Sequence, residues 1–274
     1  MHLRSCARLV WPLALLFLLA QSGILAQAPS ASAVPVKDPG AVALALKAIH
    51  AMGDPAKVAS IADSAAVGTL TVHGSQGVFS ASTTIKTKGS QELRIESQWP
   101  SGSSARIVNA GKGVIIRPDG SVKALILKNT FAERPHHIPA LSLLAEHASP
   151  NIEITASGQS SVAGAPADII SLSLPTSSDP QQAQFFREST RRSFYIDRLT
   201  RLISKLEYPL YPENGGPPAK IEIFYSDYRN ISGVMVPFHQ ATYLDGTLQS
   251  DLVLNSVQFN VGLADSDFIL PEVK

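Results

Sequence analysis

The spacing of apolar and polar residues changes near residue 67, from the helical repeat of about 3.6 residues to the strand repeat of two. The alternation is clearest in residues 92–99, where one side carries Leu93, Ile95, Ser97 and Trp99. The other side carries only polar residues: Glu92, Arg94, Glu96 and Gln98. One largely apolar and one polar face are typical of an antiparallel sheet that is covered on one side and wet on the other.

The same alternation recurs along most of the chain and predicts a long series of antiparallel strands. The strongest turn signal is Asp245-Gly246, which is typical of a two-residue hairpin. The predicted strands cover residues 67–73, 78–87, 92–99, 106–109, 114–117, 151–155, 167–174, 192–196, 202–208, 220–229, 234–244 and 247–259. Two polar stretches, residues 175–185 and 211–218, are predicted to be loops.

Helix signals stand directly before this strand series. Asp38 offers a carboxylate as N-cap and Pro39 suits the first helical position. The same order repeats at Asp54 and Pro55, followed by an apolar stripe that continues as far as Ala65. Two short amphipathic helices are therefore predicted before the sheet.

A third helix is predicted where the alternation stops, between residues 129 and 150. Pro139 can begin this helix, and Pro150 stops it. Its apolar residues gather on one side: Ile138, Leu141, Leu144, Ala145 and Ala148. Such a side is expected to cover an open sheet.

The first residues have the form of a secretory signal. Arg4 and Arg8 precede an apolar run over residues 9–19, and Ala26-Gln27-Ala28 has the small-x-small form of a signal-peptidase site. We predict a signal peptide at residues 1–28, with cleavage after Ala28 or Ala26, and a periplasmic mature protein. An uncleaved membrane anchor is the alternative, but the apolar run is short of the ~20 residues that a spanning helix needs.

The rest of the chain predicts a flexible leader at residues 29–37 and a single domain at residues 38–274. Removal of 28 residues from 274 leaves 246, a length that one sheet domain can reach. Without Arg4 and Arg8, 21 basic residues stand against 22 acidic ones, which gives no electrostatic footprint for nucleic acid or an anionic membrane. Cys6 is the only cysteine and would leave with the signal, so neither a disulfide nor a lipid anchor is expected.

The C-terminal third carries a family resemblance. Its motifs are Phe194-Tyr195-Ile196-Asp197, Leu206-Glu207-Tyr208, Tyr225-Ser226-Asp227-Tyr228, Gly233 before Pro237-Phe238, Asp245-Gly246, Asn260 and Asp267-Phe268. Together with the order of two helices, strands, a helix and more strands, these motifs resemble the LolA-like group of outer-membrane lipoprotein-sorting and lipoprotein-localisation proteins.

The resemblance implies an α+β fold: a curved, incompletely closed antiparallel β-barrel (half-barrel) with helices covering the concave face. It also implies that the concavity holds acyl chains, which gain ~25 cal/mol for each Å² of apolar surface removed from water. The candidate cavity residues are Leu93, Ile95, Trp99, Phe194, Ile196 and Phe259. Leu141 and Leu144 are the candidates on the lid helix. Each of these residues would equally be ordinary core in a sheet protein.

Local catalytic and metal-binding signatures are missing from the sequence. It contains no Gly-x-Ser-x-Gly, Ser-x-x-Lys, His-Glu-x-x-His or phosphate-binding glycine motif. His136 and His137 are interpreted as solvent-exposed loop residues, because zinc needs three or four converging ligands. We therefore assign no catalytic residue, no metal site and no cofactor.

Two functions of different classes remain open at this stage. One is a non-catalytic periplasmic carrier whose partner is a lipid or a lipidated protein. The other is a structural or interaction subunit of a cell-envelope assembly, with a filled interior and another envelope protein as partner. An exported hydrolase is the third possibility. Nucleic acid is not expected as a partner, nor is a stable membrane anchor after signal cleavage.

Overall fold

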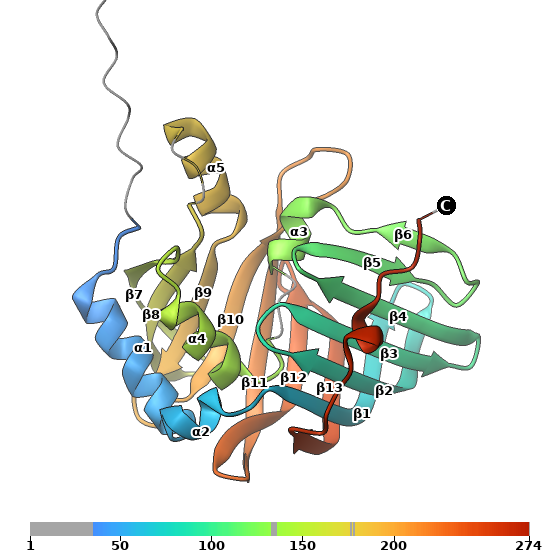
Figure 1. Ribbon diagram of the computed structural model, residues 1–274, viewed down its shortest axis with the longest axis horizontal. Helices are drawn as coiled ribbons and strands as arrows, with labels where there is room; N and C mark the ends of the chain where they lie inside the picture. The colour runs from blue at the N-terminus through green and yellow to red at the C-terminus, as the bar shows by residue number, and fades with distance from the viewer. Residues whose placement is uncertain (1–34, 133–135, 176, 178, 274) are drawn as a thin grey trace, which may run out of the picture. The chain divides into compact units, whose positions relative to one another are not determined.

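The computed structural model describes residues 35–132, 136–175, 177 and 179–273. Within these residues, thirteen strands form one sheet with the order β6-β5-β4-β3-β2-β1-β13-β12-β11-β10-β9-β8-β7 (Figure 1). The sheet belongs to a compact unit that spans residues 32–274. The predicted signal peptide, its cleavage site and most of the leader lie outside the described residues.

The elements follow the chain in the order helices, strands, helices, strands. The first half of the sheet contains β1 (Asp63–Gly74), β2 (Gly77–Lys88), β3 (Glu92–Trp99), β4 (Gly102–Asn109), β5 (Lys112–Ile116) and β6 (Val122–Ala124). The second half contains β7 (Glu153–Val162), β8 (Ala165–Ser173), β9 (Arg192–Asp197), β10 (Ile203–Leu210), β11 (Ala219–Ile231), β12 (Val234–Leu244) and β13 (Thr247–Phe259). The helices are α1 (Pro39–Met52), α2 (Pro55–Ala59), α3 (Leu127–Ala132), α4 (Pro139–Ala148) and α5 (Pro180–Ser189), and a 3-10 turn, η1, spans Asp265–Phe268.

The two halves of the sheet join where β1 pairs with β13. This pairing is antiparallel, like every other strand pair of the sheet, and it brings together the first and the last strand in the sequence. The outermost strands, β6 and β7, do not pair with each other, so the sheet stays open. The predicted open antiparallel sheet is confirmed, whereas the expectation that helices cover its concave face stays a prediction.

Helices α1 and α2 begin as their capping residues predict. The Asp38 carboxylate accepts a hydrogen bond from the Ala41 amide at 2.7 Å, and the Asp54 carboxylate accepts one from the Ala56 amide at 2.7 Å. The prediction that the second apolar stripe continues to residue 65 is wrong, because α2 ends at Ala59. The chain instead enters β1 at Asp63, and just before it the Ala62 amide donates to the Asn260 side chain at 2.8 Å.

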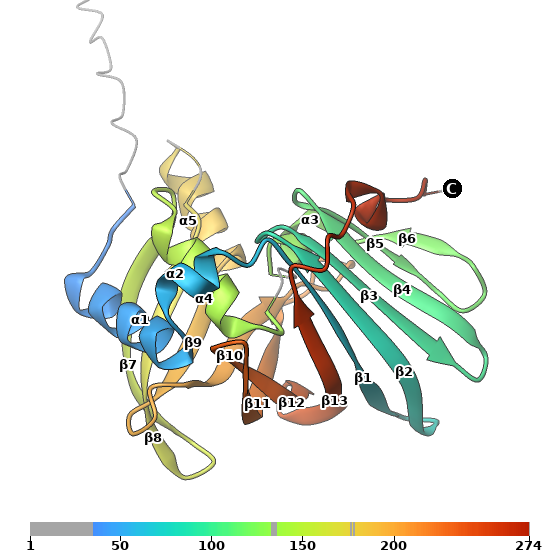
Figure 2. The same cartoon turned by 60° about the horizontal axis from the view of Figure 1, so that its bottom comes forward.

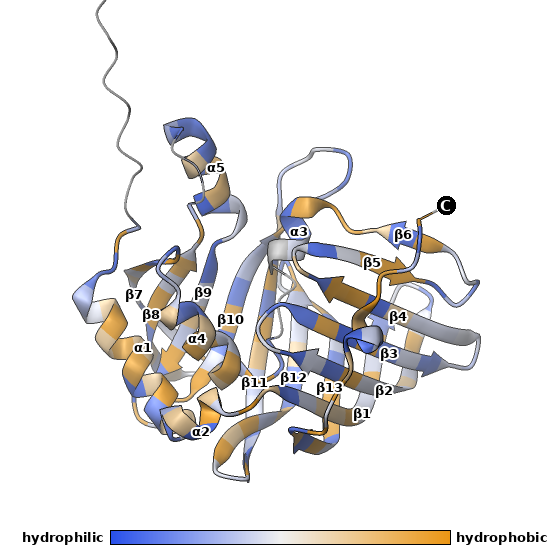
Figure 3. Ribbon diagram, in the orientation of Figure 1, coloured by the Kyte–Doolittle hydropathy of each residue, from blue (hydrophilic) through white to orange (hydrophobic). Residues whose placement is uncertain are grey.

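The main hydrophobic core lies between helices α1 and α4 and the sheet. Figures 1 and 2 show α1, α2 and α4 side by side next to the second half of the sheet, and α1 contacts both α4 and strands β7, β8 and β12. Small residues on α1 permit this close approach, and Figure 3 shows the apolar stripe that they belong to. The buried residues of α1 are Ala41, Ala45, Ala48, Ile49 and Met52.

Two further helices depart from the sequence-based expectations. Residues 175–185 were expected to form a loop, but α5 begins there, capped by Asp179, whose carboxylate accepts from the Gln181 and Gln182 amides at 2.8 and 3.0 Å. The polar sequence of α5 hides its helical repeat, because only Ala183 and Ser189 are buried. The short helix α3 was not predicted either.

The C-terminal tail, residues 260–273, is fastened across the first half of the sheet. The buried Asp63 carboxylate accepts from the backbone amides of Val261, Gly262 and Leu263 at 2.7, 3.1 and 3.1 Å. Beyond this point η1 contacts β3 and β4, where Figure 1 shows the red tail crossing the strands, and Phe268 is fully buried. The Asn260 and Asp267-Phe268 motifs therefore hold the tail on the sheet.

Candidate functional site

A groove of about 470 Å³ lies on the sheet between its two halves. Its walls come from β1 to β5 and from β10 to β13, and its apolar lining includes Leu70, Ile85, Ile95, Leu210, Ile221 and Leu252. Cross-strand pairs build this lining, since Leu70 faces Leu252 across the β1–β13 junction and Ile85 faces Ile95. The groove is therefore a product of strand register across the junction of the two halves.

The groove and the helices share one face of the sheet, which we call the inner face. Alternate residues of a strand lie on the same side, so β12 places Val236, Phe238, Gln240 and Leu244 on one face. Val236 and Phe238 belong to the core that α1 and α4 share, whereas Gln240 and Leu244 line the groove. The helices therefore occupy one end of the inner face, and the groove continues from them toward the other end.

Two pairs of polar groups in the groove are hydrogen-bonded to each other. The buried hydroxyls of Thr83 and Ser97 are hydrogen-bonded at 2.9 Å, and the Trp99 indole donates to the Ser104 hydroxyl at 2.8 Å. Satisfied hydroxyls cost little when water leaves. Arg106, between Ile95 and Ile115 in the register, is the charged residue of the lining.

The segment before α4 closes the helix end of the groove. The Tyr225 hydroxyl donates to the His136 carbonyl at 3.0 Å, and the Gln240 amide donates to the His137 carbonyl at 3.0 Å. Burial raises the pKa of Tyr225 well above its usual value, so its hydroxyl remains a donor. His136 lines the groove, and these two bonds fix its backbone to β11 and β12.

His137 is buried, with 4% of its surface exposed, so its interpretation as a solvent-exposed loop residue is wrong. Burial, and to a smaller extent the neighbouring His136, lower the pKa of His137 to about 3. Its Nε2 atom has no hydrogen-bond partner among the described residues. The imidazole is therefore neutral at ordinary pH.

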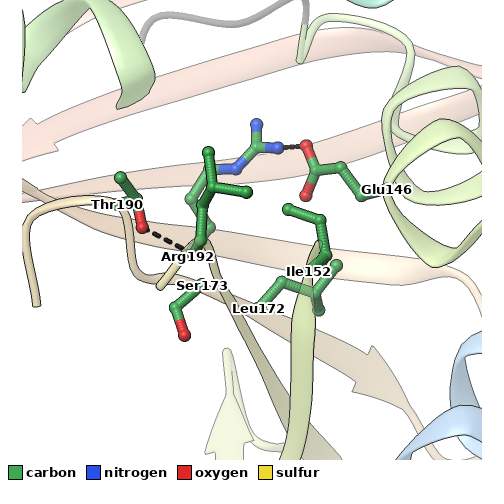
Figure 4. Close-up of a pocket in the computed structure, with 7 residues that line it drawn as sticks. Glu146, Ile152, Leu172, Ser173, Thr190 and Arg192 are labelled. Carbon is green, nitrogen blue, oxygen red and sulfur yellow. Dashed lines mark hydrogen bonds and ion pairs between the residues drawn. The ribbon is translucent and has the colours of Figure 1, made fainter. Parts of the chain in front are cut away.

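A buried ion pair fastens α4 to the sheet. Figure 4 shows the guanidinium of Arg192, from β9, pointing at the carboxylate of Glu146, from α4. Each side chain is only 3% exposed, and Ser142 lies one turn before Glu146, 3.5 Å from the guanidinium. The adjoining pocket of about 10 Å³ has room for no more than a single water molecule. This arrangement positions a helix and offers no space for a ligand.

Helix α4 presents a different side to the core from the one predicted. Its most buried residues are Pro139, Ala140, Ser142, Leu143 and Glu146. Leu141 and Leu144 are half-buried and pack against the main core. Helix α4 turns Glu146 toward the sheet, because the partner of Glu146 is the buried Arg192 of β9.

The structure divides the predicted cavity residues into two groups. Ile95 and Trp99 line the groove. Leu93, Phe194 and Ile196 are buried in the main core, and Phe259 is half-buried against it. Contact of any of these residues with a ligand stays a prediction. Leu70 and Leu252 lie in predicted strands, but their meeting depends on the pairing of β1 with β13, which the pattern of a single strand does not reveal.

A polar network lies on the opposite, outer face. The Ser226 hydroxyl contacts His239 Nδ1 at 2.9 Å, and the Asp251 carboxylate contacts the Nε2 atoms of His239 and His73 at 3.0 Å each. Serine, histidine and carboxylate in this order match the composition of a hydrolase triad. However, these residues line neither the groove nor the second large pocket, between α3, α5 and residues 211–216.

Comparison with known proteins identifies the fold. No protein-family model matches the chain, and no curated protein matches it. Among solved structures, a DUF1329 family protein from Desulfovibrio piger superposes with a TM-score of 0.55 at 15% identity, covering 85% of this chain and 98% of its own. A LolA superfamily protein from Nitrosomonas europaea superposes with a TM-score of 0.52 at 15% identity, covering 84% of this chain and 97% of its own. The chain has the LolA-like fold.

A third structure, a putative outer membrane lipoprotein-sorting protein domain from Vibrio parahaemolyticus, has a TM-score of 0.53 at 12% identity, covering 84% of this chain and 96% of its own. At such identities the likeness establishes the LolA-like fold and no more, and the resemblance drawn from the C-terminal motifs is confirmed at that level. In the part of the chain that the structure describes, no helix is long and apolar enough to cross a membrane.

Proposed function

We propose that this protein is a non-catalytic carrier, exported to the periplasm, that holds an acyl chain of a lipid or lipoprotein in the groove. The observation that carries the proposal is the apolar groove of about 470 Å³ on the inner face, next to the helices. Ligand pockets commonly measure ~300–1,000 Å³ and are mainly apolar with a few polar groups. The groove agrees with this description in both size and lining.

An acyl chain suits this lining energetically. Each methylene group that leaves water for an apolar wall contributes about 0.8 kcal/mol. The hydroxyls of Thr83 and Ser97 are hydrogen-bonded to each other. Displacement of water from them by an acyl chain therefore costs little free energy. The similarity to a structure described as a lipoprotein-sorting domain supports the same choice of ligand.

The alternative, a structural subunit of an envelope assembly, expects a filled interior. The groove leaves space between the sheet halves, which favours the carrier. A hydrolase would have to use the outer-face network of Ser226, His239 and Asp251, where a substrate would lie on the open surface of the sheet.

Binding can be tested with a variant that fills the groove. Ile95→Trp adds volume to the lining, and we expect it to weaken the binding of a fluorescent fatty acid at least tenfold. The matched control is Val253→Trp, because Val253 lies on the outer face and is 45% exposed. Native mass spectrometry of the mature protein, expressed with its signal, should show a co-purified lipid. A clean apo mass together with equal fatty-acid affinities in both variants contradicts the carrier.

The same preparation tests for catalysis. We expect no turnover of fatty-acyl or short-chain esters, and Ser226→Ala should leave fatty-acid affinity unchanged. Ester turnover by the unmodified protein that disappears in Ser226→Ala would instead establish a hydrolase on the outer face.

A further inference from the structure

Two neighbouring turns at one end of the sheet expose apolar side chains. Val78 and Phe79, at the start of β2 directly after the β1–β2 turn, are 63% and 49% exposed. Trp99, the last residue of β3 before the β3–β4 turn, is half-buried. We call residues 74–79 and 99–103 the rim. Neither segment contains a charged residue.

The rim is continuous with the groove. Phe79 lies opposite Val72 in the β1–β2 pair, so the two side chains share the inner face, and Val72 lines the groove. Trp99 lines the groove as well. The exposed aromatic ring of Phe79 therefore lies just beyond the groove, on the same face as its lining.

The rim lies at the end of the groove away from α1, α2 and α4. Strand β12 begins at Val234, which bridges to Gly53 between α1 and α2. It ends at Leu244, which lines the groove. The next strand, β13, returns past Ser250, which is paired with Val72 close to the rim. The covered end and the exposed end of the inner face are thus opposite ends of the same strands.

We propose that the rim docks on the surface of a lipid bilayer, with Val78, Phe79 and Trp99 entering the interface. This inference rests on the proposed carrier function and names the surface with which the groove exchanges its ligand. Tryptophan and other aromatic residues favour the interface between headgroups and hydrocarbon, whereas charged residues are costly there. The rim meets both conditions, because it contains the aromatic residues Phe79 and Trp99 and no charged residue.

Charges flank the rim and do not interrupt it. Arg117 and Asp119 lie in the β5–β6 turn, and Asp245 lies in the β12–β13 turn, at the same end of the sheet. This mixture of signs gives no cationic patch for an anionic bilayer. Docking therefore depends on apolar contact, and it should be reversible because few side chains enter the interface. The acyl chain would then pass between bilayer and groove without exposure to water.

Vesicles of phosphatidylcholine test the proposal. The mature protein should co-sediment with them to the same extent at low and high salt, because no charge pairing is involved. The double variant Val78→Ser and Phe79→Ser should reduce vesicle affinity at least tenfold while its fatty-acid affinity in solution stays unchanged. Leu199→Ser is the matched control, since Leu199 is 90% exposed in the turn at the opposite end of the strands.

Trp99 provides an internal probe, because Trp11 belongs to the predicted signal and no other tryptophan follows. With the groove preloaded with fatty acid, brominated vesicle lipids should quench Trp99 in the unmodified protein and not in the double variant. Fatty-acid binding without co-sedimentation overturns the docking alone. So does co-sedimentation that requires anionic lipid, that salt abolishes, or that Leu199→Ser weakens equally. Loss of fatty-acid binding itself overturns the carrier function.

Discussion

His137 is buried as a neutral imidazole, and this burial makes the free energy of unfolding depend on pH. Unfolded, it should titrate near the usual value of 6.5, whereas folding lowers its pKa to about 3. Below pH 6.5, His137 therefore binds a proton in the unfolded chain but stays neutral in the folded chain. Stability is complete above this pH and falls as the pH decreases from 6.5 toward 3.

We predict that His137→Leu removes this part of the pH dependence. The unmodified protein should lose up to about 1.4 kcal/mol of unfolding free energy per pH unit more than the variant between pH 6 and 4. Urea unfolding at several pH values measures the difference. His50→Leu, on the exposed side of α1, should follow the unmodified protein. Parallel curves for all three proteins would show that His137 does not titrate in this way.

At the scale of elements, the placement of α4 depends on one pair of charges. Burial of Glu146 and Arg192 is costly for each alone, and their mutual attraction offsets that cost only while both are present. We predict that Glu146→Leu or Arg192→Met alone destabilises the fold by about 3–5 kcal/mol, while the two substitutions together restore most of the loss.

Equilibrium urea unfolding of the two single variants and the double variant measures the coupling. A matched control is Asp265→Asn, which breaks an ion pair with Lys88 in which Asp265 is 89% exposed, and which should cost less than about 1 kcal/mol. Additive losses in the double variant would mean that the two charges do not stabilise each other.

The prediction of helices and strands was correct where the sequence signal is local, as in a capping pair or the alternation of one strand. Asp38-Pro39 and Asp54-Pro55 marked two helix starts, and alternation marked β3 with the right bounds. Asp179-Pro180 is the same capping signal, but the polar residues after it carry no apolar stripe, so α5 was missed. The face of α4 could not be predicted, because a glutamate inside the core makes sense only once its distant arginine partner is known.

The groove shows the same limit. Ile95 and Trp99 were identified because their own strand alternates so regularly. Leu93 and Ile196 share that alternation but are covered by other elements, which the pattern of a single strand does not reveal. Which inner-face residues meet helices and which meet the groove depends on where the helices end on the sheet.

At the scale of the whole molecule, ligand binding and stability are coupled. A ligand that binds only the folded protein adds about 2.7 kcal/mol at a free concentration of one hundred times Kd. We predict that a saturating fatty acid raises Tm by roughly 5–10 °C, since 1 kcal/mol corresponds to about 2–4 °C for a domain of this size. Differential scanning calorimetry measures the shift. The Ile95→Trp variant should show little change, and equal shifts in both proteins would place the binding site elsewhere.

The pairing of β1 with β13 also sets an order of events during folding. Strand β1 obtains β2 as a neighbour early, but its other edge remains open until residues 247–259 have been made. An open edge is a template for wrong pairing, and contacts between the two ends of a chain form slowly. The last strand therefore completes both halves of the sheet at once, and the edge of β1 stays unpaired for nearly the whole synthesis of the chain.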